Sequence, residues 1–224
     1  MQRVDVFDLE KVGNNLLCPN KAVTLGKRQL VDSIWKSAGI EGLGTTFSNT
    51  SRILSNLLVE TRSEEVFFII NMKRAWYFLF DNLECEDNLA FLREVNKVVL
   101  DRLAYGAGEL RTCIVSIGGT DWKPEIPSLD IVVQELERIS KISNCVERAL
   151  EMFCYICRAQ LFIDGNKRVA QLMCNKILMQ NNIGILSVPY KLVPDFKEKL
   201  VDYYESNDPE TLKKFLREEA LMLV

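Results

Sequence analysis

The stretch that decides the fold is Arg158–Asn175, RAQLFIDGNKRVAQLMCN. The string DGNKR at its centre gathers an acid, a glycine, an asparagine and two cations, and an apolar run with helical spacing follows. Gly165 and Asn166 adopt positive φ with little strain, so the pattern predicts a tight turn that opens a helix. The free N–H groups of a helix start attract an anion, and Lys167 and Arg168 add positive charge there. Because that charge opposes the helix dipole, the stretch predicts an anionic ligand; an ordinary loop with a solvated basic pair is the plainer alternative.

The composition is that of an ordinary globular protein. The chain has 224 residues, 48% of them hydrophobic and 26% charged, which suits one domain with a short N-terminal extension. The net charge of -3 argues against a general nucleic-acid binder. No apolar run is long enough to cross a bilayer, and the start MQRVDVFDLE is too charged for a signal peptide. We therefore expect a cytoplasmic protein without a membrane partner.

The absence of histidine excludes several kinds of mechanism. With no histidine in the sequence, imidazole cannot act as base, acid or metal ligand. The seven cysteines are odd in number and scattered, which does not indicate a disulfide framework. Cys154 and Cys157 form a CxxC, but they stand in an apolar helical pattern, which favours a core helix face over a zinc site.

Hydrophobic spacing predicts an all-α protein. We expect an irregular arm over residues 1–23 and a single domain over residues 24–224, with a first helix over about 25–38. Ser63 and the two glutamates after it predict a helix start, and the apolar run that follows is typical of the buried centre of a bundle. Asn144 with Glu147 predicts a capped start for the helix that precedes the DGNKR string. Helices are also expected over 48–58, 88–103, 128–142, up to 181, and over the C-terminal part at about 194–223.

One segment favours strands instead of helix. Residues 112–117 are rich in β-branched side chains with alternating polarity, and Gly118-Gly119 supplies the two residues of a hairpin turn. The sequence therefore predicts one small β-hairpin over about 111–124, standing on a helical bundle.

Together these features resemble the Fic/Doc (Fido) family, whose motif is written H-x-F-x-[DE]-G-N-[GK]-R. Residues 160–168, QLFIDGNKR, fit this motif except that Gln160 stands at the histidine position. The GELR and IGG strings within residues 108–119 are similar to the family's β-hairpin flap. Residues 37–42, SAGIEG, are similar to its [ST]xxxE[GN] inhibitory helix motif. The order of elements agrees over roughly residues 30–205.

The resemblance implies a Fic-like helical bundle in which the motif turn binds the phosphates of ATP with Mg²⁺. The residues that it assigns to the nucleotide, or to another phosphate ligand, are Gly165, Asn166, Lys167 and Arg168. It assigns Asp164 to the metal, held through the phosphates, and it places Gln160 at the position of the family's base.

The resemblance also implies a protein target, which pairs with the flap as an added strand. The flap residues that it assigns to this docking are Val115, Ile117, Gly118 and Gly119. The inhibitory position falls on Ser37, Glu41 and Gly42, although a helix end capped by Gly42 explains the same letters.

Gln160 departs from the family at the residue that matters most for catalysis. A carboxamide can orient a hydroxyl group, but it does not accept a proton near neutral pH. General base catalysis typically contributes ~10²–10⁴-fold, so its loss is severe for transfer and leaves phosphate binding possible. We expect a nucleotide-binding protein related to transferases that move AMP from ATP to a protein hydroxyl, itself catalytically impaired. The alternatives are an active AMP- or phosphotransferase with a non-histidine mechanism, and a structural relic that binds no nucleotide.

Two further departures concern the charges around the motif. The GNK form also occurs in the Doc branch, whose toxins transfer phosphate, so Lys167 either changes how a triphosphate lies or fills its space. Gln171 replaces a second arginine that usually pairs with the inhibitory glutamate, so Glu41 lacks its usual partner. Arg168 could serve instead.

Overall fold

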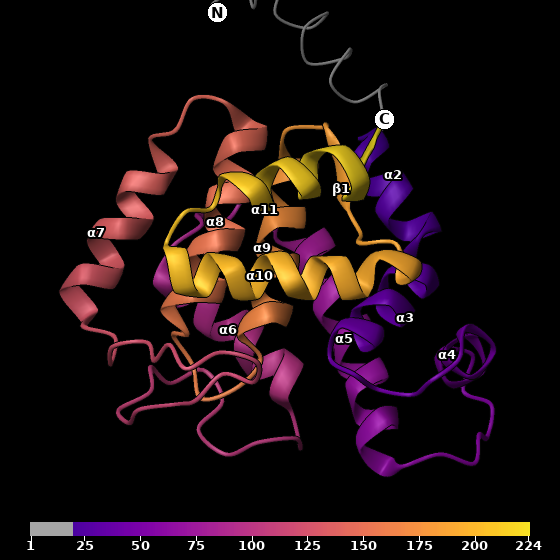
Figure 1. Ribbon diagram of the computed structural model, residues 1–224. Helices are drawn as coiled ribbons and strands as arrows, with labels where there is room; N and C mark the ends of the chain where they lie inside the picture. Colours follow the sequence, from indigo (N-terminus) through magenta and orange to yellow (C-terminus); the bar gives the residue numbers. More distant parts are fainter. Residues whose placement is uncertain (1–19) are drawn as a thin grey trace, which may run out of the picture.

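Helix α9, Asn166–Gln180, runs through the centre of the protein and carries the DGNKR string at its start (Figure 1). The computed structural model describes residues 20–224. The apolar residues of α9 are fully buried, and the helix packs mainly against α8, Cys145–Ala159. Burial all round a helix requires neighbours on every side, so the rest of the fold is a shell of helices around α9.

The shell comprises helices on both sides of the α8–α9 pair. Helix α10, Val193–Ser206, crosses α8, where Phe196 meets Phe153 edge-on with ring centroids 6.1 Å apart. Helix α7 stands at the edge of the bundle (Figure 1). The remaining helices are α2 (Lys21–Arg28), α3 (Leu30–Ile40), α4 (Phe47–Leu54), α5 (Ser63–Asp81), α6 (Leu89–Leu100), α7 (Leu129–Ser140), α10 (Val193–Ser206) and α11 (Glu210–Phe215).

Side-chain caps set the helix starts that the sequence made visible. The Asn144 carboxamide accepts hydrogen bonds from the backbone N–H groups of Val146 and Glu147, so α8 begins where its capping pattern predicts. Asn88 caps α6 in the same way through the N–H of Phe91. Cys154 and Cys157 are buried at 1% and 0% exposure, on the core face that their helical spacing predicts.

The N-terminal expectation of an arm followed by one helix differs from the structure. Helix α2 already begins at Lys21, within the arm expected over residues 1–23, and residues 1–19 lie outside the described part of the chain. The first helix expected over about 25–38 is two helices, because the helical conformation is interrupted at Gln29 (φ -92°, ψ 6°) before α3 starts.

The predicted fold class, a helical protein with one small antiparallel pair of strands, is confirmed. In the described residues that pair joins β1, Gly184–Leu186, to β2, Leu221–Leu223, with Ile185 opposite Met222. The last helix expected up to residue 223 is therefore shorter. After α11 the chain forms a five-residue π-helical segment, Leu216–Ala220, and then enters β2.

The strands expected at residues 111–124 are not formed. Only the turn is present: Gly118 and Gly119 form it, with Gly119 at φ +90°. A side chain takes the place of the strand hydrogen bonds, because the guanidinium of Arg111 joins both ends of the segment by donating to the carbonyls of Cys113, Pro124 and Glu125. A loop whose ends are held in this way satisfies its backbone groups there without strand pairing. We keep the name flap for residues 111–124.

None of the helices within residues 20–224 combines the length and apolar character that crossing a bilayer requires.

Candidate functional site

Helix α3 ends in a conformation that presents Glu41. Gly42 adopts φ +79°, its N–H donates to the carbonyl of Gly39 at 3.0 Å, and the N–H of Leu43 donates to that of Ala38 at 2.9 Å. This pair of bonds is a Schellman motif, which calls for glycine at the left-handed position. Gly42 therefore caps the helix, and Glu41 is the last residue before the chain turns away.

The end of α3 is held in place by an aromatic contact with the segment before α10. The rings of Trp35 and Tyr190 stack with centroids 4.4 Å apart and planes 5° from parallel. A Cβ added at Gly39 would lie 2.6 Å from the Tyr190 ring, so only glycine allows this close approach. The position of Glu41 thus depends on packing one turn earlier in the helix.

The motif loop is organised by the side chain of Asn166. Its Oδ1 accepts the N–H of Phe162 at 3.0 Å, and its Nδ2 donates to the Phe162 carbonyl at 2.8 Å and to Gln160 Oε1 at 3.0 Å. Phe162 itself is fully buried and anchors the loop in the core. The side chain of Asn166 is therefore used inside the loop, and only its backbone N–H is left for a ligand.

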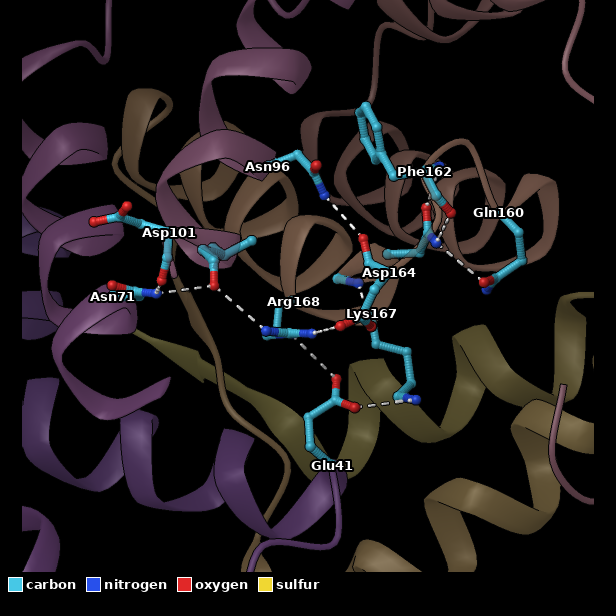
Figure 2. A network of polar contacts seen from close by, with 12 residues as sticks. Glu41, Asn71, Asn96, Asp101, Gln160, Phe162, Asp164, Lys167 and Arg168 are labelled. Carbon is cyan, nitrogen blue, oxygen red and sulfur yellow. Dashed lines mark hydrogen bonds and ion pairs between the residues drawn. The ribbon is translucent and has the colours of Figure 1, made fainter. Parts of the chain in front are cut away.

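Gln160 ends α8 in the left-handed region, at φ 46° and ψ 58°. Its Nε2 donates to the Cys157 carbonyl at 2.6 Å, while its Oε1 accepts from Asn166. Both ends of the carboxamide are thus bonded within the protein, and Figure 2 shows the bond at its oxygen. A non-glycine residue in this region costs about 1–2 kcal/mol, which these two bonds offset.

Gly165 forms the turn at φ +80° and starts α9. The Nδ2 of Asn96, on α6, donates to the Asp164 carbonyl at 3.0 Å, and its Oδ1 accepts the N–H of Gly108 at 2.8 Å. A Cβ at Gly165 would lie 3.1 Å from Asn96 Nδ2, so the turn is fitted closely to α6. Asn96 joins the motif loop to the segment that leads into the flap.

Arg168 lies beneath the loop and is 5% exposed. Its Nη2 donates to Asp164 Oδ2 at 2.8 Å and its Nη1 to the Val99 carbonyl at 3.4 Å, while Phe68 lies 5.5 Å below the guanidinium carbon. The buried Nε of Arg168 has no hydrogen-bond partner in the described part of the chain. A strong donor in the site is therefore unsatisfied.

Glu41 supplies negative charge to this cluster. One carboxylate oxygen lies 3.3 Å from Lys167 Nζ and the other lies 3.8 Å from Arg168 Nε (Figure 2). The second distance is that of an ion pair and is too long for a hydrogen bond. The two cations stand in the first turn of α9, where the helix dipole alone would disfavour them. The glutamate of α3 thus acts as the anion that the helix start attracts.

A cavity of about 200 Å³ lies above this cluster. The predicted flap residues Val115, Ile117 and Gly118 line it together with Glu41, Gln160 and the motif residues 163–167, and Tyr204 of α10 closes one side. The structure therefore brings the flap, the motif and the predicted inhibitory position together.

Four predicted site residues lie outside this cavity's lining, and one of them is Gly42, which caps α3. Gly119 turns away toward α10, where an added Cβ would lie 3.4 Å from Val201. Ser37 is buried on the inward side of α3, and its hydroxyl has no partner among the described residues. Arg168 is covered by the loop above it, as its burial shows.

Arg111 fixes the flap to the motif. Besides the carbonyls of Cys113, Pro124 and Glu125, Arg111 binds two carbonyls at the end of α8: its Nε donates to that of Gln160 at 2.5 Å and its Nη2 to that of Ala159 at 3.4 Å. The side chain is 4% exposed and forms no ion pair with any described carboxylate, and this burial lowers the pKa of the guanidinium. A buried cation that is solvated by five backbone carbonyls is a rigid clamp.

Sequence reasoning gave no role to Arg111, Asn96 or Tyr204. Asn96 did carry a signal, because it is a polar residue on the apolar face of its helix, between Leu92 and Val99. Tyr204 had none, since its place beside the motif depends on how α10 crosses the bundle.

The donor set suits an anion better than a bare cation. Asp164 is partly exposed, and its Oδ1 accepts the N–H of Gly165 at 2.6 Å while Oδ2 accepts from Arg168. Within residues 20–224 no three carboxylate, thiol or imidazole side chains gather as a metal site. A metal ion here would need ligands from a bound phosphate as well as from Asp164.

These features lie in a region of the chain that matches a protein-family model. Residues 87–178, which include the flap, α8 and the motif, match the model of the Fic/DOC family. The chain contains a Fic/DOC family domain. The QLFIDGNKR string and the loop clamped by Arg111 both lie within the matched residues.

Solved structures of Fic proteins share the fold of this Fic domain and the helices around it. Fic-1 (aa134–508) from C. elegans has a TM-score of 0.69 and 23% identity, covering 95% of this chain and 65% of that one. A Fic domain containing signaling protein from Bacteroides thetaiotaomicron has a TM-score of 0.66 and 19% identity, covering 79% and 72%. A Fic family protein from Desulfovibrio desulfuricans has a TM-score of 0.63 and 15% identity, covering 90% and 62%.

The chain spans less than two thirds of the nematode protein's solved length, at 65%. No curated protein matches the sequence.

Proposed function

We propose that the Fic domain binds the phosphate groups of a nucleotide at the start of α9, with ATP and Mg²⁺ as the ligand, and that Glu41 competes for this place. The observation that carries the proposal is the position of the Glu41 carboxylate, on Lys167 and Arg168 at the positive end of a helix. A phosphate is also negatively charged and has more acceptor oxygens. In the place of the Glu41 carboxylate it can accept a hydrogen bond from the buried Nε of Arg168.

The size of the cavity supports competition rather than simultaneous binding. Its volume of about 200 Å³ is below the roughly 300–1,000 Å³ of small-molecule sites. The donors for phosphate are present, and the room for a whole nucleotide is made when the Glu41 side chain leaves. Asp164 has an exposed side chain beside the same cavity, which supports its role next to a phosphate-held Mg²⁺.

The side chain of Gln160 supports a domain that binds a nucleotide but transfers its AMP or phosphate group poorly. The residue at the base position is an amide whose two ends are already bonded to Cys157 and Asn166. It has no basic atom to take a proton from an attacking hydroxyl. The transfer of AMP or another group to a protein, which is typical of Fic domains, is therefore proposed to be impaired here.

The flap is the proposed docking edge for a protein target. Residues 115–118 have no strand partner in the described structure, and they line the cavity. Backbone groups in such an extended segment can pair with an incoming strand, and Val115 and Ile117 would contact its side chains.

Calorimetric titration with ATP and Mg²⁺ tests the binding proposal. Glu41→Gln removes the competing charge and keeps the shape of the α3 end, so we expect affinity to rise about tenfold, the effect of roughly 1.4 kcal/mol. Glu60→Gln is the matched control, because Glu60 is exposed and takes no part in the described ion pairs at the motif. Absence of heat from both wild type and Glu41→Gln would contradict the proposal.

A further inference from the structure

A second and larger cavity lies on the other side of the flap. It measures about 680 Å³ and opens between α7, α8, the end of α10 and residues 122–128. This volume falls within the roughly 300–1,000 Å³ typical of small-molecule sites. Its described lining shares no residue with that of the motif cavity, so the two are separate sites.

The walls of this α7 cavity are partly aromatic and partly aliphatic. Tyr155 and Tyr203 contribute two phenol rings. Burial raises the pKa of Tyr155 and of Tyr203, so both hydroxyls stay neutral donors. Ile131 and Val132 of α7 supply the opposite wall, and the Ile131 side chain is 59% exposed.

The acidic residues inside the α7 cavity are already neutralised. Glu151 binds Arg138 at 2.6 Å and Lys213 at 2.5 Å, and Glu135 binds the same arginine at 2.8 Å. Lys123 and Glu125 line the rim, where both are exposed and their opposite charges cancel.

Arg158 lines the α7 cavity and has no carboxylate partner among the described residues. Within the described residues it forms no ion pair; its Nη2 donates to the Tyr204 carbonyl at 3.3 Å and its buried Nε has no partner. The guanidinium carbon lies 4.3 Å from the centroid of the Trp122 ring, whose other neighbour is the Tyr204 ring at 5.8 Å. This stack orients the guanidinium and weakens its hydration, and burial lowers its pKa.

We propose that the α7 cavity binds a small organic anion with a flat apolar body. Its anionic group pairs with Arg158, and its body packs between the tyrosine rings and the aliphatic face of α7. The faces of Trp122 are taken by Arg158 and Tyr204, so the body lies against Tyr155 and Tyr203 instead. The anion supplies the charge partner that the described residues do not give to Arg158.

Two fluorescent probes with the same rings test this proposal. 1-Anilinonaphthalene-8-sulfonate carries an anionic group, and N-phenyl-1-naphthylamine lacks it. We expect one saturable site for the sulfonate on the full chain, with binding that is unaffected by saturating ATP and Mg²⁺. Arg158→Met should weaken the sulfonate about tenfold and leave the neutral probe unchanged, since a charge-assisted bond is lost.

Two further variants place the site and control for general effects. Ile131→Trp fills the cavity from an exposed position, so it should weaken both probes without altering the fold. Arg148→Met changes an arginine of the same helix that does not line the cavity, and it should change neither. Equal sulfonate affinity in wild type and folded Arg158→Met overturns the proposal. If Arg158→Met does not fold, unchanged sulfonate binding to Ile131→Trp, or displacement by ATP, overturns it.

Discussion

The carboxylate of Glu41 lies 3.3 Å from the ammonium group of Lys167, across the gap between the end of α3 and the start of α9. The chain thereby provides its own counter-ion for a helix start that carries two cations. The expected partner position, one turn further along α9, is Gln171, whose amide donates to the Lys167 carbonyl instead. The lysine of the GNK string thus takes up the contact with the glutamate, and Arg168 supports it from below.

Coupling between Glu41 and Lys167 can be measured directly. The single variants Glu41→Gln and Lys167→Met should each lower the free energy of unfolding, and the double variant should lose less than their sum. We expect a coupling of about 0.5–1 kcal/mol, because both side chains are partly exposed. Urea unfolding of the four proteins gives this number, and it should shrink in 1 M salt. Strict additivity would show that the pair contributes nothing.

Replacing Gln160 by histidine tests the assignment of the missing base. Histidine is tolerated in the left-handed region better than most residues, so the φ of 46° at this position suits it. With a basic nitrogen restored, transfer of label from α-³²P-ATP to protein should rise by about 10² or more. A parallel assay with γ-³²P-ATP separates AMP transfer from phosphate transfer. Equal labelling by wild type and variant would mean that Gln160 is not what limits the reaction.

Arg111→Met should release the flap. The substitution leaves the five clamped carbonyls without their donor, and we expect a loss of about 3 kcal/mol in unfolding free energy. Amide hydrogen exchange should accelerate over residues 112–125 more than in α9. Arg62→Met, at an exposed position before α5, serves as the control. Uniform acceleration in every element would indicate general destabilisation without a specific clamp.

Glu151 should contribute to acid sensitivity. Burial acts to raise the pKa of Glu151, but hydrogen bonds from Lys213 and Arg138 outweigh it and hold that pKa below its ordinary value. A carboxyl with a lowered pKa contributes its full stability above the unfolded value and loses it as the pH falls through the folded one. The unfolding free energy of Glu151→Gln should therefore fall less steeply than that of wild type below about pH 5. Glu198→Gln, on an exposed face of α10, should keep the wild-type slope.

The parts of the fold that follow from local chemistry were predictable. Asn144 and Asn88 mark helix starts because their side chains satisfy N–H groups only a few residues away. The end of α3 was visible for the same reason, since a glycine at the left-handed position is a local requirement. The likeness to Fic proteins also rested on short strings, which is why the motif turn could be placed at Gly165.

The parts that depend on distant contacts were not predictable. Residues 112–117 have strand-forming side chains, yet Arg111 satisfies the ends of the loop and no ladder forms. β1 and β2 have three residues each, too short to show alternation, and they pair across 35 residues or more of chain. The contact of Lys167 with Glu41 requires knowing how α3 lies on α9, which no local pattern contains.

The guanidinium of Arg111 donates its hydrogen bonds to main-chain carbonyl oxygens, and every residue type has the same carbonyl oxygen. The shape of the flap is therefore largely indifferent to which side chains stand at its ends. A surface built in this way can exchange its outward-facing residues without losing its frame, so substitutions there should change what the flap contacts and leave its shape unchanged.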